Sequence, residues 1–350
     1  MVEEEAVSLI RLHSIEGFGN SGILAAFKKT QNPKEILARI DEFSYKPIKN
    51  SLSVHDAKKQ LDYINQNNIS IIPIYSPQYP PQLRTIEKPP AILYSLGNEK
   101  LLLNQSSLAV VGTRKYSPYG KEVCSLLLPE IAKHSIPIVS GMAIGIDSFA
   151  HEQALNNNGP TIAVLGSGVN IISPMQNTHL YHRIVESGCI ISEFPIDFQA
   201  QRYTFTQRNR IVSGLAKALL VIEAGEKSGT MITTNHALEQ GREVCVVPGP
   251  ITSFSSQGTN KLLQLGATPI TNPQDLLDIF LLKTAPFKKP ILSNPTHQLI
   301  VNALYDGSRT IEDLSIKTGL LPTELMLATS ELELDGTITG EGDYSFTLRY

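Results

Sequence analysis

The sequence has no tryptophan, only three cysteines and no long apolar run. Cys124, Cys189 and Cys245 lie far apart and form no Cys-x-x-Cys pair, so we expect reduced core residues rather than disulfides. No stretch approaches the roughly 20 apolar residues that a membrane span requires. The first five residues include three glutamates, where a secretory signal would be basic. These absences predict a cytoplasmic protein without a membrane partner.

An excess of positive charge is also missing. The 350 residues carry 30 Lys and Arg against 33 Asp and Glu, a formal net charge of −3. Proteins that coat duplex DNA are usually much more basic, so any nucleic-acid site here must be local. The length is sufficient for two or three domains with large cores.

Recognised catalytic and cofactor motifs are absent as well. The Gly166-Ser-Gly168 turn lacks the third glycine of a dinucleotide fingerprint, and residues 225–230 lack the spacing of a nucleotide-binding P-loop. His179 and His182 could share a helix face, but no further ligands with metal spacing accompany them. There is no nucleophile elbow and no acidic cluster for the metals of a nuclease. We therefore predict no catalytic residues, no cofactor and no metal.

What is present, from residue 107 to 270, is an alternation of short apolar runs with longer amphipathic stretches. This pattern predicts an α/β fold, an extended Rossmann-like, doubly wound and mostly parallel sheet. The predicted strands are 107–112, 136–140, 161–166, 189–192, 218–223 and 244–248. The predicted helices are 119–134, 147–157, 177–187, 228–240, 258–265 and 273–282.

Smaller segments flank this core, which we place at 66–282. Residues 1–65 predict a helical module, with short helices around Gly17 and Gly19, and 70–97 form a proline-rich approach to the sheet. Prolines and lysines in 283–295 predict a linker. In 296–350 we expect helices at 296–305, after Thr310 and from Pro322, then a turn at 335–336 between short strands. This order is typical of a winged-helix-like module.

Small-residue turns follow three of the predicted strands, at 112–115, 140–147 and 228–230. Ligands of open parallel sheets bind beyond the carboxyl ends of the strands, and glycine turns before helices attract phosphate. The alternative is ordinary turn chemistry, with Asp147 and Ser228 as plain helix caps. His151 on the same helix is better explained as a structural partner than as a catalyst.

Charge is segregated along the chain. Residues 198–222 hold four basic side chains without an acid, interleaved with Tyr203 and Phe205, and 101–121 hold three more. Cations for phosphates beside aromatic faces for unstacked bases suit single-stranded nucleic acid. The alternative is a solvated basic face with one buried phenylalanine.

Many of these motifs together resemble the DprA/Smf family of DNA-processing proteins over residues 70–270. They include Gly112-Thr-Arg114, the 140–147 turn with Ala150-His151, Phe205-x-x-Arg-Asn-Arg210, Ser228-Gly-Thr230 and Pro248-Gly249. The resemblance implies an extended Rossmann-like core that binds single-stranded DNA and forms a homodimer. It also implies loading of RecA onto strands covered by single-strand-binding protein during natural transformation. The N-terminal segment resembles the family's helical module, of SAM or helix-hairpin-helix type, and the C-terminal segment resembles its winged helix.

Carried over by position, the resemblance places the DNA pocket at Arg114, Arg202 and Phe205, completed or supported by Arg208, Asn209 and Arg210. With the glycine turns, the predicted DNA-binding residues are Gly112, Arg114, Ser140, Gly141, Arg202, Phe205, Arg208, Asn209, Arg210, Ser228, Gly229 and Thr230.

The chain departs from the family pattern at several positions. Asn170 replaces the usual Asp, Ser173 replaces Tyr, and Thr206 replaces Pro, which we expect to loosen the loop that carries Phe205. The third winged-helix helix and the turn after it carry Glu324, Glu331, Glu333 and Asp335 without a basic residue. Phosphate would repel that helix, so we expect the module to contact protein or its own chain.

Two rival functions stay open at the sequence level. Related Rossmann-like domains cleave nucleoside monophosphates, and Glu223 near a strand end could act as an acid or base. Those relatives typically carry a Pro-Gly-Gly-x-Gly-Thr turn, which is absent here. A transcription regulator that acts through the winged helix is disfavoured by its acidic helix.

Overall fold

The computed structural model describes residues 2–43, 50–282, 292–340 and 344–348. Its contacts divide the chain into two compact units, Met1–Lys283 and Thr284–Tyr350. Most of the predicted linker 283–295 lies outside the described residues, which resume at 292. The finer division into four parts stays a prediction.

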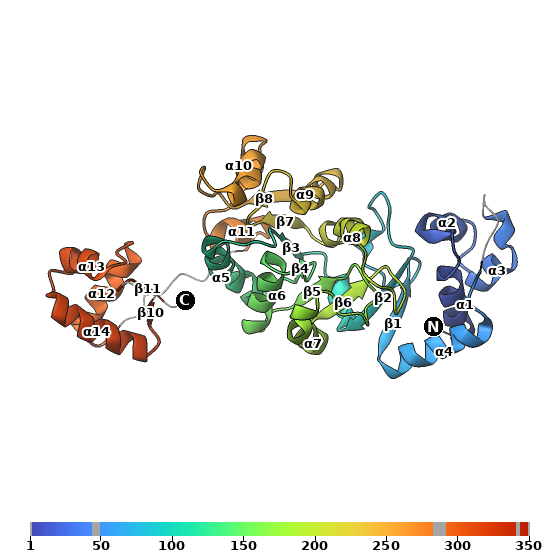
Figure 1. The fold of residues 1–350 in the computed structure, drawn as a ribbon, viewed down its shortest axis with the longest axis horizontal. Helices are drawn as coiled ribbons and strands as arrows, with labels where there is room; N and C mark the ends of the chain where they lie inside the picture. The colour runs from blue at the N-terminus through green and yellow to red at the C-terminus, as the bar shows by residue number, and fades with distance from the viewer. Residues whose placement is uncertain (1, 44–49, 283–291, 341–343, 349–350) are drawn as a thin grey trace. The chain divides into compact units, whose positions relative to one another are not determined.

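The first unit is built on a nine-stranded sheet with the strand order β1-β2-β6-β5-β4-β3-β7-β8-β9 (Figure 1). Neighbours from β6 to β9 are parallel, whereas β1 and β2 are antiparallel additions at one edge. The strands are β1 Ile69–Pro73, β2 Ile92–Gly97, β3 Leu108–Val111, β4 Ile138–Ser140, β5 Thr161–Val164, β6 Cys189–Ser192, β7 Ala218–Val221, β8 Glu243–Val246 and β9 Thr268–Pro269. The six predicted strands are confirmed. The proline-rich segment 70–97, expected only to approach the sheet, itself supplies β1 and β2.

Helices cover both faces of the parallel part, as the doubly wound prediction requires (Figure 1). They are α5 Pro118–Lys133, α6 Ile146–Asn156, α7 Thr178–Ser187, α8 Arg202–Gly214, α9 Gly229–Glu239, α10 Gln257–Gln264 and α11 Pro273–Ile279. Leu108 and Val110 pack with α5 and α6, while Ala109 and Val111 join the cluster that contains α8 residues. This alternation follows from the two-residue period of a strand. None of the described helices is long and apolar enough to cross a bilayer.

The strand order reverses between β3 and β7. β3 pairs with β4 on one side and with β7 on the other, and the chain progresses outward in both directions from that point. In open α/β sheets this switch point leaves a crevice beyond the carboxyl ends of the strands. The Gly112 and Ser228 turns both leave the sheet at this place.

One local prediction is wrong. The segment that carries Phe205 is not a loop, because Arg202–Gly214 forms the helix α8. The N–H of Gln201 donates to Oγ1 of Thr204 at 3.1 Å, which closes the first turn. Thr206 is in the helix, with its hydroxyl donating to the carbonyl of Tyr203. A proline here would lack the N–H that a helix interior uses, so Thr206 extends regular structure instead of loosening it.

The N-terminal helices are α1 Glu3–His13, α2 Gly19–Phe27, α3 Pro33–Ala38 and α4 Val54–Gln66. The short helices expected around Gly17 and Gly19 are thereby confirmed. Leu9, Ile23 and Ile64 belong to the same buried cluster as Ile92 and Tyr94 of β2. This module therefore shares one apolar core with the edge of the sheet.

The second unit has its own core, which includes Ile300, Leu314, Leu325 and Leu332. It consists of α12 Pro295–Tyr305, α13 Ile311–Thr318, α14 Pro322–Leu334, and the antiparallel pair β10 Ile338–Gly340 and β11 Phe346–Leu348. Thr310 caps α13 through a hydrogen bond from the N–H of Asp313, as its position predicted. The turn at 335–336 was expected between two strands but lies between α14 and β10.

Candidate nucleic-acid interface

A pocket of about 820 Å³ opens where the glycine turns meet α8 and the start of α9. We call it the strand-end pocket. It contains ten of the twelve residues predicted to bind DNA: Gly112, Arg114, Gly141, Arg202, Phe205, Arg208, Asn209, Ser228, Gly229 and Thr230. The turns after β3, β4 and β7 therefore converge at the switch point. Residues far apart in the chain form one surface.

One face of α8 forms a wall of the strand-end pocket. Arg202, Phe205, Thr206, Asn209 and Val212 all line it. Their spacings of one, three and four residues place them on one side of a helix. Thr206 and Val212 were not predicted, because the segment was not recognised as helical.

Two side chains from different elements meet at this wall. The guanidinium carbon of Arg114 lies 5.5 Å from the centroid of the Phe205 ring. Arg114 is exposed, whereas Phe205 is half-buried. The cation thus covers the aromatic face and carries its own charge outward, an arrangement that attracts phosphate and offers a planar surface for a base.

Arg208 lies deeper, at 3 % exposure. Its Nη1 donates to the carbonyl of Gly141 at 2.6 Å and also to that of Val164. Burial lowers the pKa of Arg208 to about 10, an effect that nearby Asp147 opposes, so the side chain stays charged at neutral pH. Burial raises the pKa of Asp147, although Arg208 and the N–H of Gly141 favour its carboxylate. Arg208 therefore fixes the β4 turn and leaves a positive charge under the pocket floor.

Gly141 is required by that packing. A Cβ atom added there would lie 2.3 Å from both terminal nitrogens of Arg208. Gly229, by contrast, has nothing within 4 Å of an added Cβ. The two glycines thus serve different purposes, close packing at one turn and an open helix start at the other.

The start of α9 provides unpaired donors. The first N–H groups of a helix have no partner within it, and the helix dipole favours an anion there. Ser228 precedes this helix, and its hydroxyl oxygen is buried without a hydrogen-bond partner among the described residues. The Nε of Arg208 is in the same situation. Both atoms are shielded from solvent, so the exposed helix start around Gly229 is the part of the strand-end pocket that suits a bound phosphate.

Two predicted site residues lie outside the lining of this pocket. Ser140 is fully buried, and its hydroxyl donates to the carbonyl of Val110 at 2.6 Å. Arg210 forms an ion pair with buried Glu193. Ser140 therefore ties β4 to β3, and Arg210 neutralises an interior carboxylate.

The side chains considered for catalysis have structural partners. Glu223, at 1 % exposure, accepts hydrogen bonds from the backbone and hydroxyl of Ser117 and from the hydroxyl of Ser255. His151 is buried against the hydroxyl of Thr161 at 2.6 Å, and burial lowers its pKa to about 3. Cys124, Cys189 and Cys245 are free thiols in the core, as predicted. No group of three His, Cys, Asp or Glu side chains suited to a metal ion lies in the described ranges.

Comparison with known proteins identifies a family that this chain matches. The family model described as DNA recombination-mediator protein A matches residues 70–281. Protein Smf of Escherichia coli K12 is 38% identical over 293 residues, which cover 80% of this chain and 78% of that protein. The DNA processing protein DprA of Bacillus subtilis 168 is 37% identical over 240 residues, 68% of this chain and 81% of the relative.

Solved structures agree with these sequence matches. The X-ray structure of DprA from Streptococcus pneumoniae superposes with a TM-score of 0.68 at 32% identity, covering 78% of this chain and 96% of that one. A structure of DprA from Helicobacter pylori superposes with a TM-score of 0.56 at 33% identity, covering 61% of this chain and 95% of that one. That structure is described as showing a single-stranded DNA binding mode. Both similarities extend over almost the whole of the chain in the other structure.

Proposed function

This chain belongs to the family of DNA recombination-mediator protein A, the DprA and Smf proteins, and we propose that it binds single-stranded DNA in the strand-end pocket. The observation that carries the proposal is the Arg114 guanidinium over the Phe205 ring, at the mouth of a pocket with unpaired donors. The single-stranded DNA binding of the Helicobacter pylori relative supports it.

Each part of the pocket has a distinct task. Arg114 and Arg202 are exposed cations that contact phosphates directly. A further phosphate binds at the start of α9, beside the Ser228 hydroxyl. Because Arg114 covers Phe205, a base stacks on the outer face of the guanidinium, with the ring beneath it. Stacking and phosphate contacts read no base edge, so binding tolerates any sequence.

The charge pattern favours single strands over duplex. The cations lie in a confined pocket rather than across a broad face, and the chain as a whole is acidic. A single strand bends its backbone into such a pocket and exposes its bases, whereas a duplex keeps its bases stacked and its phosphates on a rigid helix.

A titration with three ligands tests this function. Labelled oligo-dT, a duplex of equal length and nucleoside monophosphates are each added to the full chain at 50 and 200 mM salt. We expect oligo-dT to bind most tightly, and to bind about tenfold or more weakly at the higher salt. Equal affinity for duplex would contradict the proposal. Release of free base from a monophosphate would instead support a nucleotide-processing enzyme, for which buried Glu223 offers little.

The role of the chain beyond DNA binding is inferred from its family alone. We infer that the chain acts without catalysis, as a homodimer, and loads RecA onto single strands covered by single-strand-binding protein. The test is the rate of RecA filament formation on coated oligo-dT. An Arg114→Ala variant should lose the stimulation that the wild-type chain provides, and no stimulation by the wild type would exclude this role while leaving DNA binding intact.

A further inference from the structure

Among the described residues, β1 is an edge strand, and its side away from β2 has no partner strand. It pairs with β2 through antiparallel register in which Ile72 faces Leu93 and Ser70 faces Ser95. The N–H of Ile74 donates to the carbonyl of Ala91 at 2.9 Å, and hydrogen-bonded pairs alternate along an antiparallel ladder. The backbone N–H and C=O groups of Ser70 and Ile72 therefore form hydrogen bonds with β2, while those of Ile69 and Ile71 point away from it.

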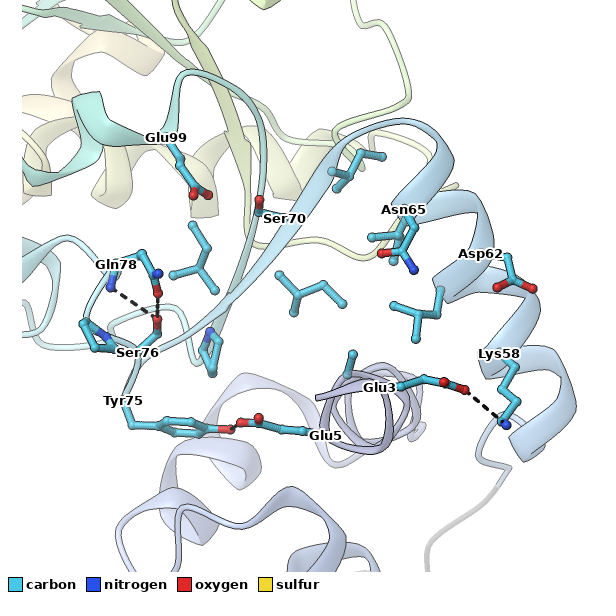
Figure 2. Close-up of a pocket in the computed structure, with 18 residues that line it drawn as sticks. Glu3, Glu5, Lys58, Asp62, Asn65, Ser70, Tyr75, Ser76, Gln78 and Glu99 are labelled. Carbon is cyan, nitrogen blue, oxygen red and sulfur yellow. Dashed lines mark hydrogen bonds and ion pairs between the residues drawn. The ribbon is translucent and has the colours of Figure 1, made fainter. Parts of the chain in front are cut away.

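These outward groups border a cavity. Within the described ranges, no backbone hydrogen bond outside the β1–β2 ladder involves Ile69 or Ile71. A cavity of about 840 Å³ is lined by all five residues of β1 together with Leu61 and Ile64 of α4. Figure 2 shows β1 crossing the cavity between α4 and the segment that carries Glu99. An added strand needs about 4.8 Å beside its neighbour, and it would find an apolar wall here. We call this cavity the β1 groove.

The rim of the β1 groove is acidic. Among its described lining residues are four carboxylates and one ammonium group: Glu3, Glu5, Asp62, Glu99 and Lys58. Lys58 forms an ion pair with Glu3 at 3.2 Å, and Glu5 accepts a hydrogen bond from the hydroxyl of Tyr75 at 2.9 Å. Asp62 and Glu99 pair with no cation in the described part of the chain. An incoming strand gains most if it brings positive charge.

We propose that the β1 groove binds an extended basic segment of a partner protein, which adds to the sheet as a tenth strand. Its backbone pairs with the outward N–H and C=O groups of Ile71 and Ile69. Side chains on the α4 side of the added strand are apolar, against Leu61 and Ile64, and those on the opposite side are basic, toward Glu99, while exposed Asp62 on α4 adds negative charge at the rim. Backbone pairing provides affinity, and the rim charge selects the partner.

A second copy of this chain fits the groove poorly. Two copies related by a two-fold axis would bring identical acidic rims together. DNA is repelled by the same carboxylates. In the sheet, β1 is separated from β3 by five strand spacings, roughly 24 Å, so the groove is distinct from the strand-end pocket. The chain could bind a strand of DNA and a partner segment together.

A synthetic peptide tests the proposal on the full chain. The probe is a labelled nine-residue peptide of alternating Lys and Val, with blocked ends, measured by fluorescence anisotropy. We expect saturable binding to the wild type, and at least tenfold weaker binding to the double variant Asp62→Lys, Glu99→Lys. The matched control is Glu122→Lys, Glu186→Lys, which changes net charge equally at exposed sites outside the groove. Equal binding by both variants, or equal binding of an alternating Glu and Val peptide, would overturn the proposal.

Modified peptides separate strand pairing from simple charge attraction without altering the protein. One peptide of alternating Lys and Val is N-methylated at its odd-numbered residues, and a second is N-methylated at its even-numbered residues. Only one of these two sets of backbone N–H groups faces β1 in an added strand. The peptide methylated on that set should therefore bind at least tenfold more weakly than the other. Equal affinity of the two would exclude strand addition. Wild-type self-association that the unmodified peptide abolishes would assign the groove to a second copy instead.

Discussion

The guanidinium of Arg114 lies 5.5 Å from the centroid of the Phe205 ring, although one follows β3 and the other belongs to α8. This contact joins the two basic stretches of the sequence at the switch point of the sheet. The strand-end pocket owes its cation-covered ring to that meeting, because the exposed guanidinium comes from one segment and the half-buried ring from the other.

Replacing Arg114 or Phe205 by Ala should weaken oligo-dT binding by about 1–3 kcal/mol, or roughly five- to 150-fold. Since the two side chains are in contact, the double variant should lose less than the sum of the single losses. Anisotropy titrations of the four proteins measure this coupling. Lys28→Ala, an exposed cation on the N-terminal module, should bind as the wild type does. Additive losses would show that the contact does not act as one unit.

Gly141 and Gly229 line the same pocket but should respond differently to substitution. In Gly141→Ala the new methyl group overlaps the Arg208 guanidinium, which is held by backbone carbonyls and has little room to move. We expect a loss of about 1–3 kcal/mol in the free energy of unfolding, measured by urea denaturation. Gly229→Ala places its methyl group in open space and should leave stability within about 0.5 kcal/mol of the wild type. A stable Gly141→Ala variant would mean that Arg208 is not fixed as described.

The fold of this chain is predictable from sequence where a pattern repeats. Each predicted strand lies in an apolar run whose successive residues, such as Val110 and Val111, pack on opposite faces of the sheet. The glycine turns were also found, because their positions after strands have a physical purpose. In the predicted site, ten residues converge, but that convergence depends on the strand order, which no local pattern encodes.

The errors have equally local causes. The sequence does not predict α8, because its first turns are polar and aromatic, a composition more typical of a binding loop than of an amphipathic helix. The sequence signal for a helix in this segment is the spacing of one, three and four residues between the pocket-lining positions from Arg202 to Val212. Arg210 was grouped with its neighbours, yet the helix directs it to buried Glu193. Whether an arginine binds a ligand or an interior carboxylate depends on the partner, which lies elsewhere in the sequence.

Removing the second unit tests the role of the acidic helix α14. Glu324, Glu331 and Glu333 are exposed on it, so it should not approach phosphate. The unit has its own core, and a chain that ends at 283 keeps the whole strand-end pocket. We expect its oligo-dT affinity to stay within about threefold of the full chain, since no cation of the pocket is lost. Loss of all DNA binding would favour a regulator that acts through the winged helix.

Acid should destabilise the first unit through His13, which is half-buried beside Tyr94. His13 stacks on Tyr94, and its Nδ1 lies 3.2 Å from the phenol oxygen. Burial lowers the pKa of His13 from 6.5 to about 4. Between these values the unfolded chain binds a proton that the folded chain does not, so stability falls as pH decreases below 6.5. From pH 7 to pH 5 this one side chain should cost about 2 kcal/mol of unfolding free energy.

The variant His13→Gln isolates that contribution. Glutamine does not titrate, so the difference in unfolding free energy between the variant and the wild type should change by about 2 kcal/mol from pH 7 to pH 5. The variant is the less stable protein at pH 7, because it loses the stacked ring on Tyr94, and it should close part of that gap in acid. Urea denaturation of both proteins at the two pH values measures the change. Parallel pH profiles would mean that His13 is protonated as readily in the folded state as in the unfolded chain.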